Sequence, residues 1–327
     1  MKYRRFGRLG WQVSEIGFGA WPLGGGMWGE QSDQDSVAAL HRFLDLGGNF
    51  IDTAQAYGNG RSERVIAQAL KGRPGGERVY VATKIPPKPG SWPPSPYDTV
   101  QDRFDEAYLR ERLERSLRDL GTDCIDLVQL HTWNRAWNRD PAALEVLEKF
   151  RDEGKLLGIG ISAPDHDPDA TDDVMHAGLV DSVQLIYSIF DQDPQAEALP
   201  VAAEHDVAII VRVPFDEGAL TGKLTPQTTF PAEDFRSRYF AGDRLERTVR
   251  RVEAIRETLG TDEPDLAAAA LKFTLKPQAV STVIPGMRNP RQVELNTAVS
   301  DQPPMSDEVE QRLRAHSWRR SNWYAGK

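Results

Sequence analysis

The chain has 327 residues, a net charge of −9 at neutral pH and a hydrophobic fraction of 39%. This composition provides for a large buried core, and the acidic balance argues against nucleic-acid binding, which needs a basic face. No apolar run approaches 18 residues, so we expect no transmembrane helix and no membrane partner. The N-terminus lacks the apolar h-region of a secretory signal, and Cys124 is the single cysteine. We therefore expect a cytoplasmic protein of undetermined oligomeric state, in which Cys124 is a small buried residue.

Alternating strand and helix patterns run through most of the chain. Residues 3–14 come first, and their GRLG turn predicts a β-hairpin. Helical stretches such as EAYLRERLERSLRDLG, which stops at Gly121, then separate short β-type runs. The expected strands are Ile16–Gly19, Asn49–Asp52, Val79–Thr83, Ile125–Leu130, Leu157–Ile161, Ser182–Ile186, Ala208–Val213 and Ser281–Ile284. Eight such strands predict an α/β protein with a (β/α)8 TIM barrel. A flat doubly wound sheet is the alternative, but it normally shows a glycine-rich turn after its first strand.

Some segments lie outside this repeat. The proline-rich residues 85–104 and residues 214–243 are expected to form long loops, and Asp243–Leu259 an extra helix. A final helix is expected over Asp307–Ser317, followed by a tail with three aromatic residues, Trp318, Trp323 and Tyr324. The chain has no internal repeat and no linker, so we expect residues 1–327 to form one domain.

Four polar side chains fall at predicted strand ends or just beyond them. The second strand ends in Asp52, the third in Lys84 and the fourth in His131, while Tyr57 follows Asp52 by five residues. In a TIM barrel, functional groups come from the C-terminal ends of the strands and from the loops that follow. We therefore expect these four side chains to meet at one rim of the barrel.

The chemistry of the four groups is mutually consistent. A tyrosine with its ordinary pKa near 10 is a weak acid, and the nearby Lys84 ammonium is expected to lower the pKa of Tyr57. Asp52 can hold Lys84 in place, and His131 can hydrogen-bond a carbonyl oxygen. Such a site suits the reduction of a carbonyl to an alcohol. Because no side chain can donate hydride, a nicotinamide cofactor must supply it.

At these residues the chain resembles the aldo-keto reductase superfamily, and the resemblance covers nearly its whole length. Asp52 and Tyr57 lie in NFIDTAQAYGNGRSERVIAQAL, Lys84 lies in VATKI and His131 lies in DLVQLHTW. These motifs match the four catalytic positions of the family in their order. The resemblance implies a (β/α)8 barrel, an extended nicotinamide cofactor and no metal.

The resemblance also implies where the cofactor binds. GKLLGIGIS and VQLIYS supply residues near the carboxamide, PFDEGALTGK resembles the pyrophosphate-covering loop, and VIPGMRNPRQVELN resembles the adenosine-binding segment. The implied cofactor residues are Ala20, Trp21, Asp52, Ser162, Gln184, Arg212, Phe215, Gly218, Leu220, Gly222, Lys223, Gly286, Met287, Arg288, Gln292 and Asn296. A helix beginning near Pro290 offers free N–H groups, and Arg288 suits a phosphate. We therefore expect NADPH rather than NADH.

Three positions depart from the family pattern near the cofactor. Ala163 stands where many members carry an asparagine that contacts the carboxamide, and Arg212 stands where many place an aromatic ring against the nicotinamide. Phe215 is a candidate substitute for that ring. Leu295 replaces a glutamate often found just before the residue equivalent to Asn296. These changes concern cofactor contacts and leave the proton-transfer residues intact.

Aromatic residues are expected around the substrate, which should be a small carbonyl compound. Trp21, Trp28 and Trp133 are the candidate pocket residues, and such rings favour apolar or planar aldehydes and ketones, or sugar faces. One alternative is a regulatory barrel like the subunits of potassium channels, which binds NADP(H) with little turnover. A metal-dependent barrel hydrolase is not expected, because its usual His-x-His pair is absent.

Overall fold

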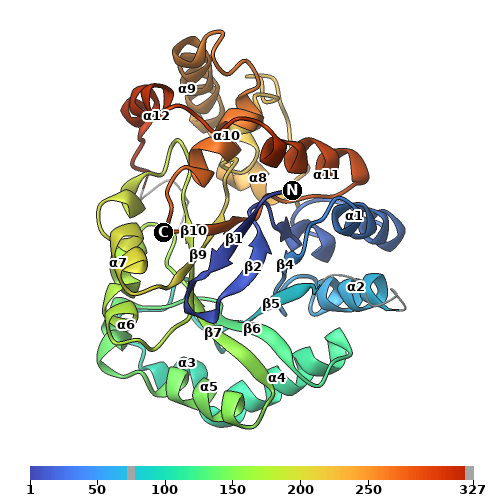
Figure 1. The fold of residues 1–327 in the computed structure, drawn as a ribbon, viewed down its shortest axis with the longest axis vertical. Helices are drawn as coiled ribbons and strands as arrows, with labels where there is room; N and C mark the ends of the chain where they lie inside the picture. The colour runs from blue at the N-terminus through green and yellow to red at the C-terminus, as the bar shows by residue number, and fades with distance from the viewer. Residues whose placement is uncertain (72–77, 321–327) are drawn as a thin grey trace.

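The computed structural model describes residues 1–71 and 78–320, and in them eight parallel strands form one continuous sheet (Figure 1). Isolated bridges pair Ile16 with Val283 and Gly19 with Gly286, which joins the first strand of the sheet to the last. The strands are β3 (Phe18–Gly19), β4 (Phe50–Asp52), β5 (Tyr80–Ile85), β6 (Ile125–Leu130), β7 (Leu156–Ser162), β8 (Ser182–Ile186), β9 (Ala208–Arg212) and β10 (Val280–Val283). The predicted (β/α)8 barrel is confirmed.

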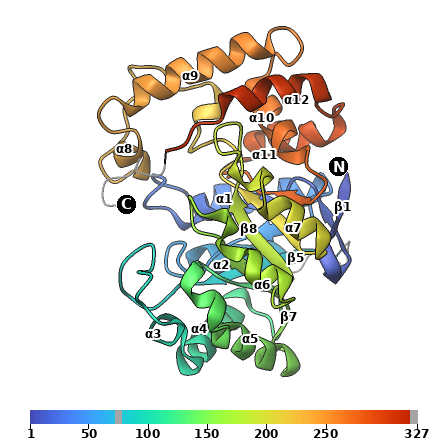
Figure 2. The ribbon, with the colours of Figure 1, turned by 90° about the vertical axis from the view of Figure 1, so that its left-hand side faces the viewer.

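Helices surround the sheet, and several of them bury an apolar stripe against its strands. In the described residues they are α1 (Asp33–Asp45), α2 (Arg61–Leu70), α3 (Val100–Phe104), α4 (Glu106–Leu120), α5 (Ala142–Asp152), α6 (Asp172–His176), α7 (Ala198–Glu204), α8 (Phe235–Tyr239), α9 (Arg244–Leu259), α10 (Leu266–Leu275), α11 (Pro290–Thr297) and α12 (Asp307–Leu313). Helices α9 and α12 pack side by side at one edge of the molecule (Figure 2). The predicted stop of α4 is confirmed, because Gly121 caps it with a φ of 66°.

The predicted N-terminal hairpin is also confirmed, and it closes one end of the barrel. Strand β1 (Tyr3–Phe6) pairs antiparallel with β2 (Trp11–Ser14). Phe6 is fully buried and packs against Phe50 of β4, with ring centroids 5.3 Å apart. Side chains alternate along a strand, so Asp52, two residues beyond Phe50, also points into the barrel but nearer its other end. The hairpin therefore leaves the C-terminal end of the barrel for the functional groups.

The two predicted long loops are present, but each contains short helices that were not predicted. Residues 85–104 end in helix α3, and residues 214–243 contain α8 and a 3-10 turn over Ala219–Thr221. These helices have three to five residues, too few to show an apolar period in the sequence. The final helix ends at Leu313 and continues as a 3-10 turn over Arg314–His316.

Cys124 is partly exposed rather than buried, because it lies in the turn before β6 and not within the strand. Its hydrogen-bonding partners are local: its N–H donates to the hydroxyl of Thr122. The aromatic tail residues Trp323 and Tyr324 lie outside the described residues. In the described part of the chain, no helix combines the length and the apolar character needed to cross a membrane.

Candidate active site

A cavity of about 1420 Å³ lies at the C-terminal ends of the strands and brings together most of the predicted site residues. Those that line it are Trp21, Trp28, Asp52, Tyr57, His131, Ser162, Gln184, Arg212, Phe215, Gly218, Lys223, Gly286, Arg288, Gln292 and Asn296. Lys84 lies behind this surface and is fully buried. Ala20, Leu220 and Met287 are buried in the core, and with Gly222 they do not line the cavity.

Lys84 connects the polar groups at the centre of the cavity. Strand β5 directs its side chain into the barrel, where Nζ donates to Asp52 Oδ2 at 2.6 Å and to the Thr53 carbonyl at 2.8 Å. The third contact is with the Tyr57 hydroxyl, at 3.4 Å from Nζ. An ammonium has three donors, so these three contacts satisfy it in a site where an unpaired charge would be costly.

Burial dominates the protonation of Tyr57 and His131. It raises the pKa of Tyr57, and the opposing effect of Lys84 is smaller, so the expected net lowering was wrong. Burial, together with the cations Lys84 and Arg212, holds the pKa of His131 well below its usual value. At neutral pH the site therefore contains a protonated phenol and a neutral imidazole, with ring centroids 5.8 Å apart.

Two glutamine amides hold Asp52 on the side away from Lys84. Gln184 Nε2 donates to Asp52 Oδ1 at 2.7 Å, and Gln129 Nε2 donates to the same oxygen at 3.2 Å. Gln129 was not predicted from the sequence. The signal was present, because Gln129 lies two positions before His131 and so faces the same side of β6.

Aromatic rings form one wall beside Tyr57. Trp21 stacks on Tyr57 with a centroid distance of 6.1 Å, and Trp28 lies edge-on to Trp21 at 5.2 Å. Phe235 of α8 lies 5.9 Å from Trp21, and Trp92, which is half exposed, lies edge-on to His131. These rings give this side of the cavity an apolar surface.

Trp133 does not belong to this wall, contrary to expectation. It is 1% exposed, its Nε1 donates to Asn138 Oδ1 at 2.7 Å, and its ring packs edge-on against Trp137. Strand β6 ends at Leu130, and its pairing with β5 is continued by the His131 N–H, which donates to the Ile85 carbonyl at 2.9 Å. Trp133 lies beyond this pairing, so the alternation that places His131 in the cavity does not apply to it.

Arg212 crosses the rim from the end of β9 to the loop after β7. Its Nη2 donates to Asp165 Oδ1 at 2.9 Å and to the Ala163 carbonyl at 3.1 Å, while its buried Nε has no partner in the described residues. The guanidinium thus contacts Ala163, the position at which many family members carry an asparagine. Asp165 was not predicted, because its role depends on a contact between residues 47 positions apart.

Glu217 is a second unpredicted cavity residue. Its side chain is 7% exposed, and burial, with the nearby carboxylates of Asp216 and Asp165, raises its pKa to about 8. A protonated Glu217 can donate a hydrogen bond into the cavity at neutral pH. Nothing in the local sequence distinguishes this residue from an exposed loop glutamate.

Glu217→Gln is expected to change how the free energy of unfolding depends on pH. The folded pKa of about 8 exceeds the ordinary value of 4.5, so the folded chain binds more protons between these pH values and wild-type stability falls as the pH rises through them. The variant lacks this loss, so its free energy of unfolding relative to that of wild type should rise by roughly 2–4 kcal/mol from pH 5 to pH 9. Urea unfolding at both pH values measures the difference. The exposed Glu233→Gln is the control, and equal behaviour of the two variants would contradict the assignment.

Arg288, which precedes α11, is the residue expected to bind a phosphate at the adenosine end of the cofactor. Its Nε donates to Gln31 Oε1 at 2.9 Å, and Gln31 Nε2 donates back to the Arg288 carbonyl at 2.9 Å. A second guanidinium nitrogen bonds the Glu30 carbonyl. These contacts orient the guanidinium at the cavity edge.

The cavity fits an extended anionic dinucleotide. Its volume exceeds the roughly 300–1,000 Å³ of ordinary small-molecule pockets, which leaves room for a dinucleotide beside a small substrate. Lys223 and Arg288 line it, as does Arg212 with its unpartnered Nε. These donors suit phosphate and amide oxygens.

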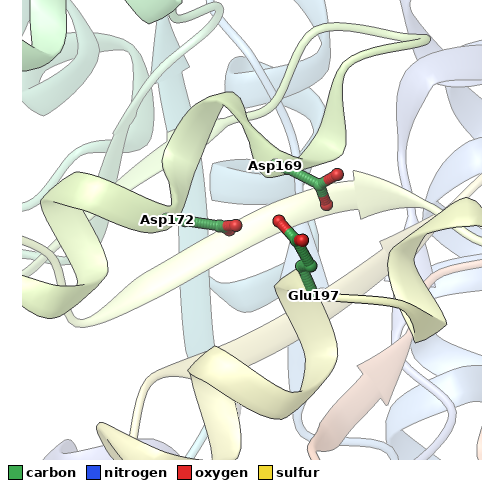
Figure 3. Close-up of side chains that lie close together, drawn as sticks. All are labelled: Asp169, Asp172 and Glu197. Atoms are coloured by element: carbon green, nitrogen blue, oxygen red, sulfur yellow. The ribbon is translucent and has the colours of Figure 1, made fainter.

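Three carboxylates converge outside the cavity, those of Asp169, Asp172 and Glu197 (Figure 3). They offer oxygen atoms within 4.8 Å of one another, and burial with the neighbouring carboxylates raises the pKa of Asp172 to about 6. Glu197 is exposed, and acidic groups gather on protein surfaces without binding an ion. We assign no metal to this cluster, and the absence of a metal cofactor stays a prediction.

Barrel, cavity and buried polar groups together define an oxidoreductase that acts on carbonyl compounds. The model of the aldo/keto reductase family matches residues 15–317, so the chain belongs to that family. Aldo-keto reductase YhdN of Bacillus subtilis is 31% identical over 237 residues, 72% of this chain and 69% of the relative. The NADH-specific methylglyoxal reductase of Escherichia coli is 29% identical over 301 residues, 88% of this chain and 89% of the relative. The holo structure of aldo-keto reductase AKR11C1 from Bacillus halodurans is similar with a TM-score of 0.76 and 28% identity, covering 97% of this chain and 96% of that one.

Proposed function

We propose that the protein reduces an aldehyde or ketone to an alcohol, with Tyr57 as the proton donor. The observation that carries the proposal is the contact of one buried ammonium, Lys84 Nζ, with both Asp52 and the Tyr57 hydroxyl at the cavity wall. A nicotinamide cofactor would supply the hydride to the carbonyl carbon. Everything else in the reaction concerns the oxygen of the substrate and its proton.

Each residue has a distinct task in this reaction. The neutral imidazole of His131 donates a hydrogen bond to the carbonyl oxygen and polarises it. The Tyr57 O–H then transfers its proton to the oxygen as negative charge develops there. Lys84 stabilises the phenolate that remains, and Asp52 pairs with the ammonium and orients it.

For the cofactor we propose NADPH, bound along the cavity from Ser162 and Gln184 to Arg288. The guanidinium of Arg288 lies at the cavity edge, where a 2′-phosphate could form charge-assisted hydrogen bonds. One relative is named as NADH-specific, so the preference requires a direct test.

Arg288→Ala is expected to raise the Kd for NADPH about tenfold or more and to change the Kd for NADH by less than about twofold. Only NADPH carries the extra phosphate, so only NADPH loses a charged contact. Fluorescence titration with both cofactors measures the two constants. Equal weakening of NADPH and NADH would reject the role of Arg288. The exposed Arg291 provides the control variant, Arg291→Ala.

The substrate class is tested by following oxidation of NADPH and NADH against a panel of aldehydes, ketones, quinones and sugars, with methylglyoxal included. We expect turnover to be highest for apolar or planar carbonyl compounds, because Trp21, Trp28 and Phe235 line the cavity. The regulatory alternative is not favoured, because Lys84 Nζ contacts both Asp52 and Tyr57 and two relatives are named as reductases. Tight cofactor binding without turnover of any carbonyl would reverse that judgement.

A further inference from the structure

Arg320, near the C-terminus of the described chain, is a buried cation outside the cavity. Its side chain is 3% exposed, and its guanidinium bonds three side chains from different segments. Nη2 donates to Asp191 Oδ2 at 2.5 Å, and Nη1 donates to Asp216 Oδ2 at 2.9 Å and to the Tyr239 hydroxyl at 3.1 Å. Asp191 follows β8, Asp216 follows β9 and Tyr239 ends α8. One residue from the tail therefore connects three segments that are distant in sequence.

Asp216, Tyr239 and Arg320 each form a hydrogen bond with the other two. The Tyr239 hydroxyl donates to Asp216 Oδ1 at 2.8 Å while it accepts from Arg320. The Asp216 side chain is only 1% exposed, and a buried carboxylate is costly unless a cation and hydrogen bonds compensate it. Arg320 supplies that cation. The neighbouring Arg319 is 84% exposed, and its Nε lies 3.5 Å from Asp193 Oδ1.

Asp216 lies in the loop that forms part of the cavity wall. Val213, Asp216 and Glu217 have φ values of 55°, 48° and 54°, in the left-handed region that side chains other than glycine rarely adopt. Such a conformation persists only where surrounding contacts impose it. Phe215 and Glu217 line the cavity on either side of Asp216. Holding the Asp216 carboxylate therefore holds the shape of this wall.

Tyr239 extends the same restraint to α8. Phe235, one turn earlier on that helix, lies 5.9 Å from Trp21, and Trp21 stacks on Tyr57. The helix also contributes Arg236 and Arg238 to the cavity lining. Arg320 thus contacts both segments that cover the cavity on this side without lining the cavity itself.

Trp318 fixes the path of the tail that presents Arg320. Its ring is buried edge-on against Phe190, with centroids 5.5 Å apart, and the backbone N–H of Trp318 donates to the Phe190 carbonyl at 2.8 Å. The guanidinium groups of Arg251 and Arg320 lie over the ring at 4.3 Å and 4.9 Å. The packing of Trp318, together with the ion pairs of Arg320, therefore directs the Arg320 side chain toward the interior.

We propose that Arg320 is a positioning residue for the nicotinamide cofactor, acting through Asp216 and Tyr239 on the loop of residues 213–218 and on α8. This inference rests on the proposed function, because it takes the cavity to be the cofactor site. Loss of the guanidinium would free the Asp216 carboxylate, relax the loop and let the cofactor leave faster. The proton-transfer residues would keep their own contacts.

The test compares Arg320→Met with Arg320→Lys and with Arg319→Met as the matched surface control. We expect Arg320→Met to raise the Kd and KM for NADPH about tenfold or more, through faster dissociation in stopped-flow fluorescence, with kcat changed by less than about threefold. Arg320→Lys should restore part of the affinity because it keeps the charge but not the fork geometry. Arg319→Met should match wild type.

Unchanged NADPH binding and dissociation in a folded Arg320→Met variant would overturn this inference and leave the proposed function intact. If that variant does not fold, Asp216→Asn serves in its place, since it keeps the side-chain shape and loses the ion pair. Affinity equal to wild type in Asp216→Asn would then overturn the inference. Failure of the wild-type protein to bind either NADPH or NADH would overturn the proposed function first, and the two failures are thereby distinguished.

Discussion

Replacing Tyr57 with phenylalanine is expected to lower kcat for carbonyl reduction by at least ~100-fold while the affinity for NADPH stays nearly constant. The variant keeps the ring that stacks on Trp21 but loses the hydroxyl that Lys84 Nζ contacts. The residues proposed to bind the phosphates of the cofactor keep their side chains in this variant, so the affinity should not change. Steady-state kinetics and fluorescence titration separate the two effects.

Tyr108→Phe is the matched control for this change. The Tyr108 hydroxyl donates to the Pro86 carbonyl at 3.0 Å, and the residue does not line the cavity. It should retain wild-type turnover. Full activity in Tyr57→Phe would show that the proton comes from another group and would reject the assignment of the acid.

Replacing Lys84 with methionine is expected to have the largest effect on stability. Its partner Asp52 would be left in a site that is 3% exposed, and breaking a buried ion pair from one side typically costs about 3–5 kcal/mol. Turnover should fall as well, because no cation would stabilise the Tyr57 phenolate. Urea unfolding gives the free energy of unfolding.

The double variant Asp52→Asn with Lys84→Met sharpens this second test. It removes both charges, so it should be more stable than Lys84→Met alone. The control is Lys88→Met, whose ion pair with Asp105 is about one-third exposed and should contribute about 0–1 kcal/mol. A similar loss for Lys84→Met and Lys88→Met would contradict the buried-pair account.

The fold was largely predictable, because strand alternation and turn chemistry are local. Strands β6 and β8 begin and end where the apolar pattern predicts. Asp52, Lys84 and His131 could be brought together because strand ends of a parallel barrel share one rim. Gln129 could have been predicted as a site residue as well, because side chains two positions apart on a strand face the same side and His131 follows it by two. Trp133 was misplaced because the strand ends before it.

The remaining features depend on contacts that no local pattern encodes. The ion pair of Arg212 with Asp165 and the contacts of Arg320 with Asp191 and Asp216 join residues 47, 129 and 104 positions apart. The direction of the pKa shift of Tyr57 depends on how deeply the phenol is buried, which the sequence does not give. Opposing effects of burial and charge can be ranked only once the surroundings are known.

We expect hydride to pass from a nicotinamide bound in this cavity to the carbonyl carbon of the substrate. The most direct test is reaction of the protein with NADPH that carries deuterium at both C4 positions of the nicotinamide and with the best carbonyl substrate of the panel, followed by mass spectrometry of the alcohol. We predict one deuterium on the carbinol carbon for each cofactor oxidised, and a product yield at least ~100-fold lower in Tyr57→Phe. Cofactor oxidation without label in the alcohol, or binding without oxidation for every carbonyl tried, would contradict the account.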